Sequence, residues 1–132
     1  MKNLLLSAAL ALFLAAPALA APMIGGAKDA HGCSGGAGYQ WSVVQNRCIR
    51  AWEAGYRLDS VTPNMAAAFV VFAMGADQSR AELYLANEKT SLLARRVKPS
   101  LWQVRAYVLA RANGKYSLSK SGKLLYQGAA AH

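Results

Sequence analysis

The two cysteines of this chain, Cys33 and Cys48, are the residues with the widest choice of chemistry. A cysteine pair can hold zinc, supply a nucleophile or form a disulfide, and its surroundings decide among these. Zinc sites draw on short CxxC pairs, whereas these two are roughly 15 residues apart, and only His31 could add a nearby ligand. We therefore set a metal site aside. The compartment of the protein then decides between a reactive thiol and a disulfide.

The N-terminus has the three-part pattern of a secretory signal. Lys2 precedes an apolar run over residues 4–14, and Ala18-Leu19-Ala20 places small residues at the two positions that a signal peptidase reads. We expect cleavage after Ala20, which makes the mature protein periplasmic or secreted, with no membrane span. Because exported cysteine pairs are oxidised, we expect a Cys33–Cys48 disulfide, worth about 3 kcal/mol for a loop of this length.

Other residues that could support catalysis are few. The two histidines are His31, in a glycine-rich N-terminal segment, and His132, the last residue, so neither is expected on a rigid element beside a nucleophile. The glycines between residues 32 and 38 do not match the phosphate-binding pattern GxxxxGK(S/T). The spacing of the six acidic residues gives no support to a glycosidase-like carboxylate pair, and Glu82 is assigned to the solvent face of a strand. We therefore expect no cofactor and no enzymatic activity.

The charge of the chain is uneven. The formal net charge is +9, and no aspartate or glutamate follows Glu88. The basic residues of that second part are Lys89, Arg95, Arg96, Lys98, Arg105, Arg111, Lys115, Lys120 and Lys123. Such a half creates a positive field and favours anionic partners, such as glycans, lipid phosphates, nucleic acid or an acidic cleft. The alternative is a solvated basic face that keeps the protein soluble.

Residues 66–97 have the patterns of three strands. The apolar run AAAFVVFAM (66–74) is typical of a buried strand. RAELYLA (80–86) alternates, with Ala81, Leu83 and Leu85 on one face and Arg80, Glu82 and Tyr84 on the solvent face. TSLLARRV (90–97) is a third strand, which ends before Lys98-Pro99. A helix is the alternative for residues 64–97, because Ser79 and Glu82 fit a capping box.

The last third of the chain has the clearest alternation. LWQVRAYVLAR (101–111) reads as a single strand, with Trp102 on one face and Tyr107 on the other. Asn113-Gly114 then predicts a tight hairpin, because both residues tolerate a positive φ. KYSLSK (115–120), a turn at Ser121-Gly122 and KLLYQ (123–127) complete the run. We therefore expect a mainly β fold, a small antiparallel β-barrel or meander that follows a disulfide-closed loop.

These segments divide the chain into five parts. They are a signal peptide (1–20), a flexible N-terminal segment (21–32), a disulfide-clasped segment (33–64), an antiparallel β domain (65–128) and a tail (129–132). Within the clasped segment, residues 50–64 are expected to be irregular chain with an aromatic anchor. The mature chain is long enough for one domain with a modest core.

The stretch HGCSGGAGYQWSVVQNRCIRAWE (31–53) resembles a short cysteine-bearing segment of small exported bacterial proteins. The matching residues are His31, Gly32, Cys33, Ala37, Gly38, Tyr39, Trp41, Cys48, Ile49, Arg50, Trp52 and Glu53. The segment has a second cysteine where this chain has Ser42, and a further cysteine after Glu53. The resemblance implies that those two normally pair and that Cys33–Cys48 is the remaining bridge. It makes the stretch a structural clasp, with Trp41 and Trp52 packed against it.

Residues 66–128 are similar in outline to the MliC/PliC-type inhibitors of c-type lysozyme. The likeness lies in the AELYL strand, the basic strand after it and the tyrosine-containing hairpins that end in SGKLLYQG. The resemblance implies a small antiparallel β-barrel of the bacterial envelope that inserts a loop serine and lysine into the lysozyme cleft. The nearest counterpart of the family's Ser-Gly-x-x-Tyr loop is Asn113-Gly114-Lys115-Tyr116. The candidate inhibitory residues are Lys115, Tyr116, Ser119, Lys120 and Lys123.

The leading hypothesis is therefore an exported inhibitor of c-type lysozyme that blocks the active-site cleft with a basic turn. The alternative is a non-enzymatic basic envelope protein that binds anionic glycans, lipids or other polyanions. The two differ in their dependence on charge. Polyanion binding follows the summed charge and weakens with salt, whereas a shaped plug is lost through one or two substitutions in one turn.

Overall fold

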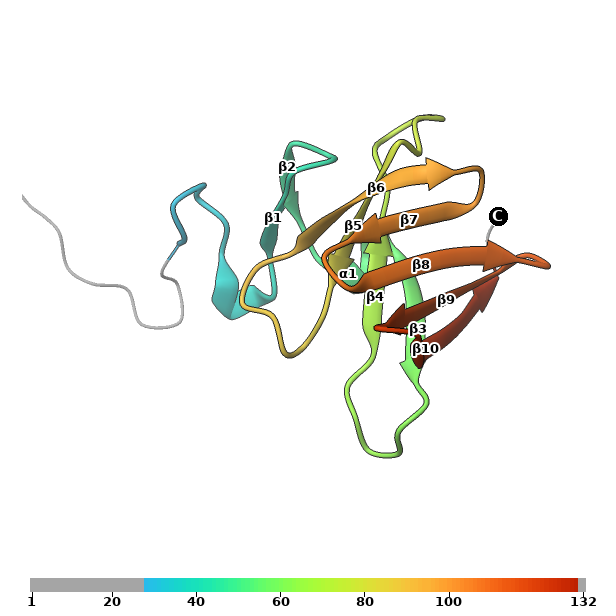
Figure 1. Cartoon of the computed structure of the whole chain (residues 1–132). Coiled ribbons are helices and arrows are strands. Elements are labelled where there is room, and N and C mark those ends of the chain that lie inside the picture. The colour runs from blue at the N-terminus through green and yellow to red at the C-terminus, as the bar shows by residue number, and fades with distance from the viewer. Residues whose placement is uncertain (1–27, 131–132) are drawn as a thin grey trace, which may run out of the picture.

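The computed structural model describes residues 28–130, which form an N-terminal clasp followed by a closed barrel of eight antiparallel strands (Figure 1). The mainly β fold expected from the sequence is confirmed, and so is the disulfide-closed loop ahead of the barrel. The predicted signal peptide (1–20) and His132 lie outside the described residues. Within residues 28–130, no helix has the length and apolar character needed to cross a membrane.

The clasp and the barrel follow each other along the chain. The clasp comprises the 3-10 turn η1 (Gly35–Ala37), strands β1 (Gln40–Ser42) and β2 (Arg47–Ile49), and the one-turn helix α1 (Ala51–Ala54). The barrel comprises β3 (Tyr56–Ser60), β4 (Ala68–Val71), β5 (Arg80–Tyr84), β6 (Leu92–Lys98), β7 (Leu101–Val104), β8 (Tyr107–Ala112), β9 (Lys115–Lys120) and β10 (Lys123–Ala130).

The barrel is an up-and-down meander that closes on itself. Its strand order is β10-β3-β4-β5-β6-β7-β8-β9, so each strand pairs with its neighbour in sequence. Closure comes from β10, which pairs with β3 at Tyr126↔Ser60 and Gln127↔Asp59. A closed sheet leaves no unpaired edge, and a barrel of this size is filled by its own side chains.

Those side chains form an aromatic core. Trp102, Tyr116 and Phe72 are buried and pack with their ring centroids 5.4–6.3 Å apart. Trp102 donates a hydrogen bond from Nε1 to the carbonyl of Gln78 at 2.7 Å, so its polar atom is satisfied. These side chains therefore fill the barrel interior with a packed core.

Strands replace the helical alternative for residues 64–97, and both predicted turns occur. Asn113 and Gly114 have φ of +54° and +75°, and Ser121 and Gly122 have φ of +51° and +83°. These values are the left-handed conformations that two-residue hairpins require. The turn residues therefore identified two hairpins correctly.

The prediction of a single strand over 101–111 is wrong. The chain reverses at Arg105-Ala106, where Arg105 has a φ of +52°, and separates β7 from β8. The turn shifts the alternation, so Tyr107 is 2% exposed inside the barrel, on the same side as Trp102 instead of the opposite face. Turns favour Gly, Pro, Asn, Asp and Ser, so the pair Arg105-Ala106 gives no turn signal in the sequence. The pattern therefore predicted one strand where the structure has two.

The expectation of irregular chain over 50–64 is also wrong. This stretch contains α1 and β3, so the barrel begins at Tyr56, inside the part assigned to the clasp. Leu58 is fully buried in the barrel between exposed Arg57 and Asp59. A strand that contributes so few apolar side chains has only a weak alternation, and the sequence pattern hides it.

Candidate functional site

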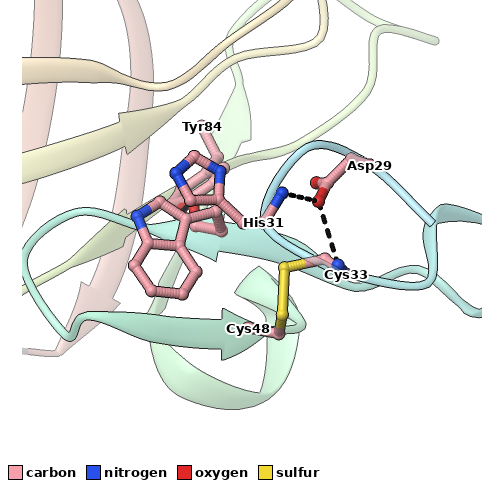
Figure 2. The surroundings of a disulfide bond; sticks show 6 residues. Asp29, His31, Cys33, Cys48 and Tyr84 are labelled. Atoms are coloured by element: carbon pink, nitrogen blue, oxygen red, sulfur yellow. Dashed lines mark hydrogen bonds between the residues drawn. A yellow bond between two sulfur atoms is a disulfide. The ribbon is translucent and has the colours of Figure 1, made fainter.

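The clasp is held by the disulfide and by a network of short contacts. Cys33 and Cys48 are bonded, with their Cα atoms 5.5 Å apart (Figure 2). Asp29 accepts hydrogen bonds from the backbone N–H groups of His31 and Cys33, each at 2.9 Å. These bonds, that of Cys33 above all, lower the pKa of the Asp29 carboxyl. Residues 28–32, the described part of the segment expected to be flexible, are therefore tied to the clasp.

The two tryptophans of the clasp contact it in different ways. Trp41 stacks on the His31 ring, with the centroids 4.4 Å apart and the planes 6° from parallel. Trp52 packs its ring against Gly38, where a β-carbon would collide with Cη2 of the indole. Trp52 nevertheless remains 54% exposed. The sequence-based expectation that both pack against the clasp is met, but one of them also presents a surface to solvent.

The clasp covers the outer face of the barrel through a second apolar cluster. Clasp residues Val44, Ile49 and Ala51 pack there with Val71 of β4 and Tyr84 of β5. Burial raises the pKa of the Tyr84 hydroxyl, which donates a hydrogen bond to the carbonyl of Trp41 at 3.2 Å. The outward side of β5 therefore belongs to an interface inside the molecule.

Glu82 lies in that interface, and its assignment to a solvent face is wrong. Its side chain is 0% exposed. Its carboxylate accepts hydrogen bonds from Ser42 Oγ at 2.6 Å, Val43 N at 2.9 Å and Ser91 Oγ at 2.7 Å. Ser42, the residue that replaces a cysteine in the resembled segment, is thus a hydrogen-bond donor to a buried carboxylate. This arrangement joins the clasp to the barrel, and its donors leave the carboxylate no approach for a substrate.

The residues that could hold a metal ion do not gather in one place among residues 28–130. No group of three or more histidine, cysteine, aspartate or glutamate side chains in the described part could hold a metal ion. Both cysteines are consumed by the disulfide, and His31 is paired with Trp41.

The five candidate inhibitory residues do not form one site. Lys120 and Lys123 face each other across the β9–β10 turn, where they are direct cross-strand partners. Lys115 starts β9 beside the opposite turn, about 17 Å away at the usual rise per strand residue. Ser119 precedes Lys120 on β9, where it is half-buried opposite Leu124 of β10. Tyr116 is 1% exposed in the core, where burial raises its hydroxyl pKa, so it cannot reach a partner.

Lys120 and Lys123, together with the two turn residues between them, form a compact surface that we call the basic turn, Lys120-Ser121-Gly122-Lys123. The ammonium of Lys120 lies 5.1 Å from the centroid of the Tyr107 ring, which restrains its side chain. The backbone N–H of Ser121 donates to the carbonyl of Ala106 at 2.9 Å, so the basic turn is braced by the neighbouring β7–β8 turn. Ser121 is exposed between the lysines, and turn preferences alone could have singled it out.

A second group of cations lies near the other end of the barrel. This arginine patch consists of Arg80, Arg95, Arg96 and Lys98, which are all exposed. Arg80 and Arg95 are direct partners on β5 and β6. None of the four forms a salt bridge with a described residue, although Arg80 and Arg96 contribute to the lowered pKa of nearby Asp77 after the Ser79 hydrogen bonds. Sequence analysis found these cations but not their pairing across strands.

Comparison of the chain with protein-family models, curated proteins and solved structures finds no match. The function must therefore be inferred from the surfaces of the molecule itself.

Proposed function

We propose that this protein is an exported, non-enzymatic inhibitor of a c-type lysozyme, which it blocks by placing the basic turn in the active-site cleft. The observation that carries the proposal is the direct pairing of Lys120 with Lys123 at an exposed barrel end. No carboxylate of the described chain forms a salt bridge with either lysine. The eight-stranded antiparallel barrel also agrees with the architecture that the family resemblance implies.

The physical argument starts from the cost of that pairing. Like charges directly opposite each other on neighbouring strands destabilise a sheet. An acidic cleft relieves this repulsion, and the cleft of a lysozyme contains two carboxyl groups at its catalytic centre. The turn is rigid before binding, because a two-residue hairpin, the Tyr107 contact and the Ser121–Ala106 bond fix it. Such preorganisation lowers the entropic cost of association.

The proposal assigns roles to three exposed residues of the turn. Lys120 and Lys123 supply the charge that meets the cleft carboxylates, and Ser121 supplies the hydroxyl between them. Lys115 and Tyr116 have no part in it, because one lies beside the opposite turn and the other in the core. Long-range repulsion between two basic proteins slows their encounter, but at physiological salt it is screened beyond about 8 Å.

The test is a titration of c-type lysozyme activity against cell walls with the oxidised protein, residues 21–132. We expect stoichiometric inhibition that Lys120→Glu or Lys123→Glu weakens by about tenfold or more, as expected for a charge reversed beside a carboxylate. Lys115→Glu is the matched control, since it makes the same charge change on the same strand at the other end. Full activity of lysozyme at a large excess of the wild-type protein would contradict the proposal.

The arginine patch favours a second candidate function, the binding of anionic glycans, lipids or other polyanions of the cell envelope. Four cations without a salt-bridge partner among residues 28–130, two of them directly paired across strands, create a local positive potential that a polyanion would neutralise. This candidate uses a different end of the barrel from the basic turn. Variants of one surface can therefore be tested without disturbing the other.

A further inference from the structure

We propose that the groove beside Trp52 binds one ring of a neutral sugar within a glycan chain. This Trp52 groove lies where the clasp meets the barrel and has a volume of about 200 Å³. Its lining residues include Trp52 and Gln40 from the clasp, Phe69 from β4, and Glu88, Lys89, Thr90 and Ser91 from the β5–β6 loop. None of these lining residues belongs to the basic turn or to the arginine patch.

The exposed indole is the first observation behind the proposal. Of the three tryptophans, Trp102 is fully buried and Trp41 is half-buried, whereas Trp52 is 54% exposed. Trp52 is also held in place, because its ring packs against Gly38 of the clasp. A large aromatic surface left in water and fixed beside a hollow has the character of a binding platform.

The polar lining is the second observation, and it selects the class of ligand. Among the described residues, the side chains of Gln40 and Thr90 make no hydrogen bond, so an amide and a hydroxyl remain available to a ligand. Glu88 is ion-paired with Arg105 at 3.4 Å and Lys89 is exposed to solvent, so the lining has no buried unpaired charge, which suits a neutral ligand. A sugar ring combines apolar C–H faces with a rim of hydroxyl groups, and therefore suits an aromatic platform bordered by polar side chains.

The size of the groove limits how much of a glycan it can hold. Its volume of about 200 Å³ lies below the range of roughly 300–1,000 Å³ that drug-sized ligands occupy, so it fits a single ring. One ring of this size supports a dissociation constant of about 1 mM, from the usual binding free energy per ligand atom. The groove would therefore add to the avidity of a longer chain more than it would bind a free monosaccharide.

The clasp is needed to form the site. Trp52 and Gln40 come from the clasp, while Ser91 of the barrel side donates to Glu82, which also accepts from Ser42 of the clasp. The same hydrogen bonds that dock the clasp thus set the width of the groove. This gives the clasp a role in recognition beyond the closure of its own loop.

The test follows tryptophan fluorescence of the oxidised protein, residues 21–132, during titration with two neutral tetrasaccharides, chitotetraose and cellotetraose. Only Trp52 is exposed enough to respond strongly, so binding of either sugar should shift its emission and protect it from acrylamide. We expect saturation in the low millimolar range, within about 10 mM. No saturable change with either sugar over that range, or binding of an anionic polymer alone, would overturn the proposal.

Three variants distinguish this site from a general surface effect. Measured by titration calorimetry, which does not depend on the indole, Trp52→Ala should abolish binding, whereas Met65→Ala, which trims an equally exposed apolar side chain outside the groove, should leave it unchanged. Because loss of the indole can loosen the clasp, Thr90→Val provides an independent test that preserves the shape of the side chain. Thr90→Val should weaken binding about 3- to 10-fold through one lost hydrogen bond. Unchanged affinity in both groove variants would overturn the proposal.

Discussion

Glu82 Oε1 accepts a hydrogen bond from Ser42 Oγ at 2.6 Å, which connects the middle of barrel strand β5 to the end of clasp strand β1. Both side chains are fully buried, and Val43 N and Ser91 Oγ complete the set of donors. A buried carboxylate is tolerated only when hydrogen bonds replace its lost hydration. The clasp supplies two of these three donors, so the barrel and the clasp stabilise each other.

The first prediction concerns this carboxylate. Glu82→Gln should lower the free energy of unfolding by about 2 kcal/mol, because an amide nitrogen would then face donors and leave buried groups unsatisfied. Urea denaturation of the two proteins measures the difference. Glu53→Gln is the control, since it makes the same change in an exposed residue that is ion-paired with Arg50 at 3.5 Å. Exposed ion pairs contribute little, so the control should change stability by less than about 1 kcal/mol. Equal effects of both variants would contradict the role assigned to Glu82.

The second prediction concerns the disulfide. Reduction of Cys33–Cys48 should lower the free energy of unfolding by about 3 kcal/mol, from the chain entropy of the loop that it closes. Denaturation with and without reductant measures this loss. The Cys33→Ala/Cys48→Ala double variant should have the stability of the reduced protein and should not respond to reductant. A wild-type protein insensitive to reductant would show that the packing against Val71 and Tyr84 holds the clasp without the bond.

The error over Glu82 shows where sequence patterns stop being informative. The alternation of 80–86 located β5 and its inward residues, because a strand in a barrel has one face in the core. It could not show that the other face is covered, since the covering residues lie about 40 positions earlier in the chain. One feature did carry the information: the cross-strand partner of Glu82 is Leu93, an apolar residue on the same outward side. A charged residue beside apolar neighbours on an outer face indicates a second layer.

The sequence predicted which residues are candidates for the site but not which of them lie together. The turn residues at 121–122 placed two lysines at a hairpin end, as observed. Lys115 and Tyr116 were candidates because Asn113-Gly114-Lys115-Tyr116 is the nearest counterpart of the family's loop, whereas the six residues of β9 separate Lys115 from Lys120 by the height of the barrel. The Asn113-Gly114 hairpin fixes the register of β8 against β9 and pairs Tyr116 with Arg111.

The third prediction concerns alkaline pH. Burial raises the pKa of Tyr84 above its ordinary value of 10.0, with a further contribution from the Glu82 charge. Above pH 10 the unfolded chain loses this proton while the folded protein keeps it, so stability falls as the pH rises. Tyr84→Phe should therefore be less stable than wild type at pH 8, by about 1 kcal/mol for one hydrogen bond, and the gap should narrow above pH 10. Urea denaturation midpoints of both proteins between pH 8 and pH 11 measure this difference in stability. A difference that stays constant over this range would contradict the raised pKa of Tyr84.

The last prediction concerns the arginine patch and separates the two candidate functions. Because Arg80 and Arg95 are direct cross-strand partners, Arg80→Gln should raise the free energy of unfolding by about 0.2–1 kcal/mol, as one like charge is removed. The same substitution should lower the salt concentration at which the protein elutes from heparin, a representative polyanion. Arg57→Gln is the matched control, because that guanidinium is ion-paired with Asp59 at 2.8 Å and adds little net charge locally. If Arg80→Gln stabilises the protein and weakens its retention on heparin, the repulsion between Arg80 and Arg95 is explained by a role of the patch in polyanion binding. If Arg80→Gln and Arg57→Gln elute alike, and lysozyme inhibition depends on Lys120 and Lys123, the patch is a solvated face and the basic turn is the functional surface.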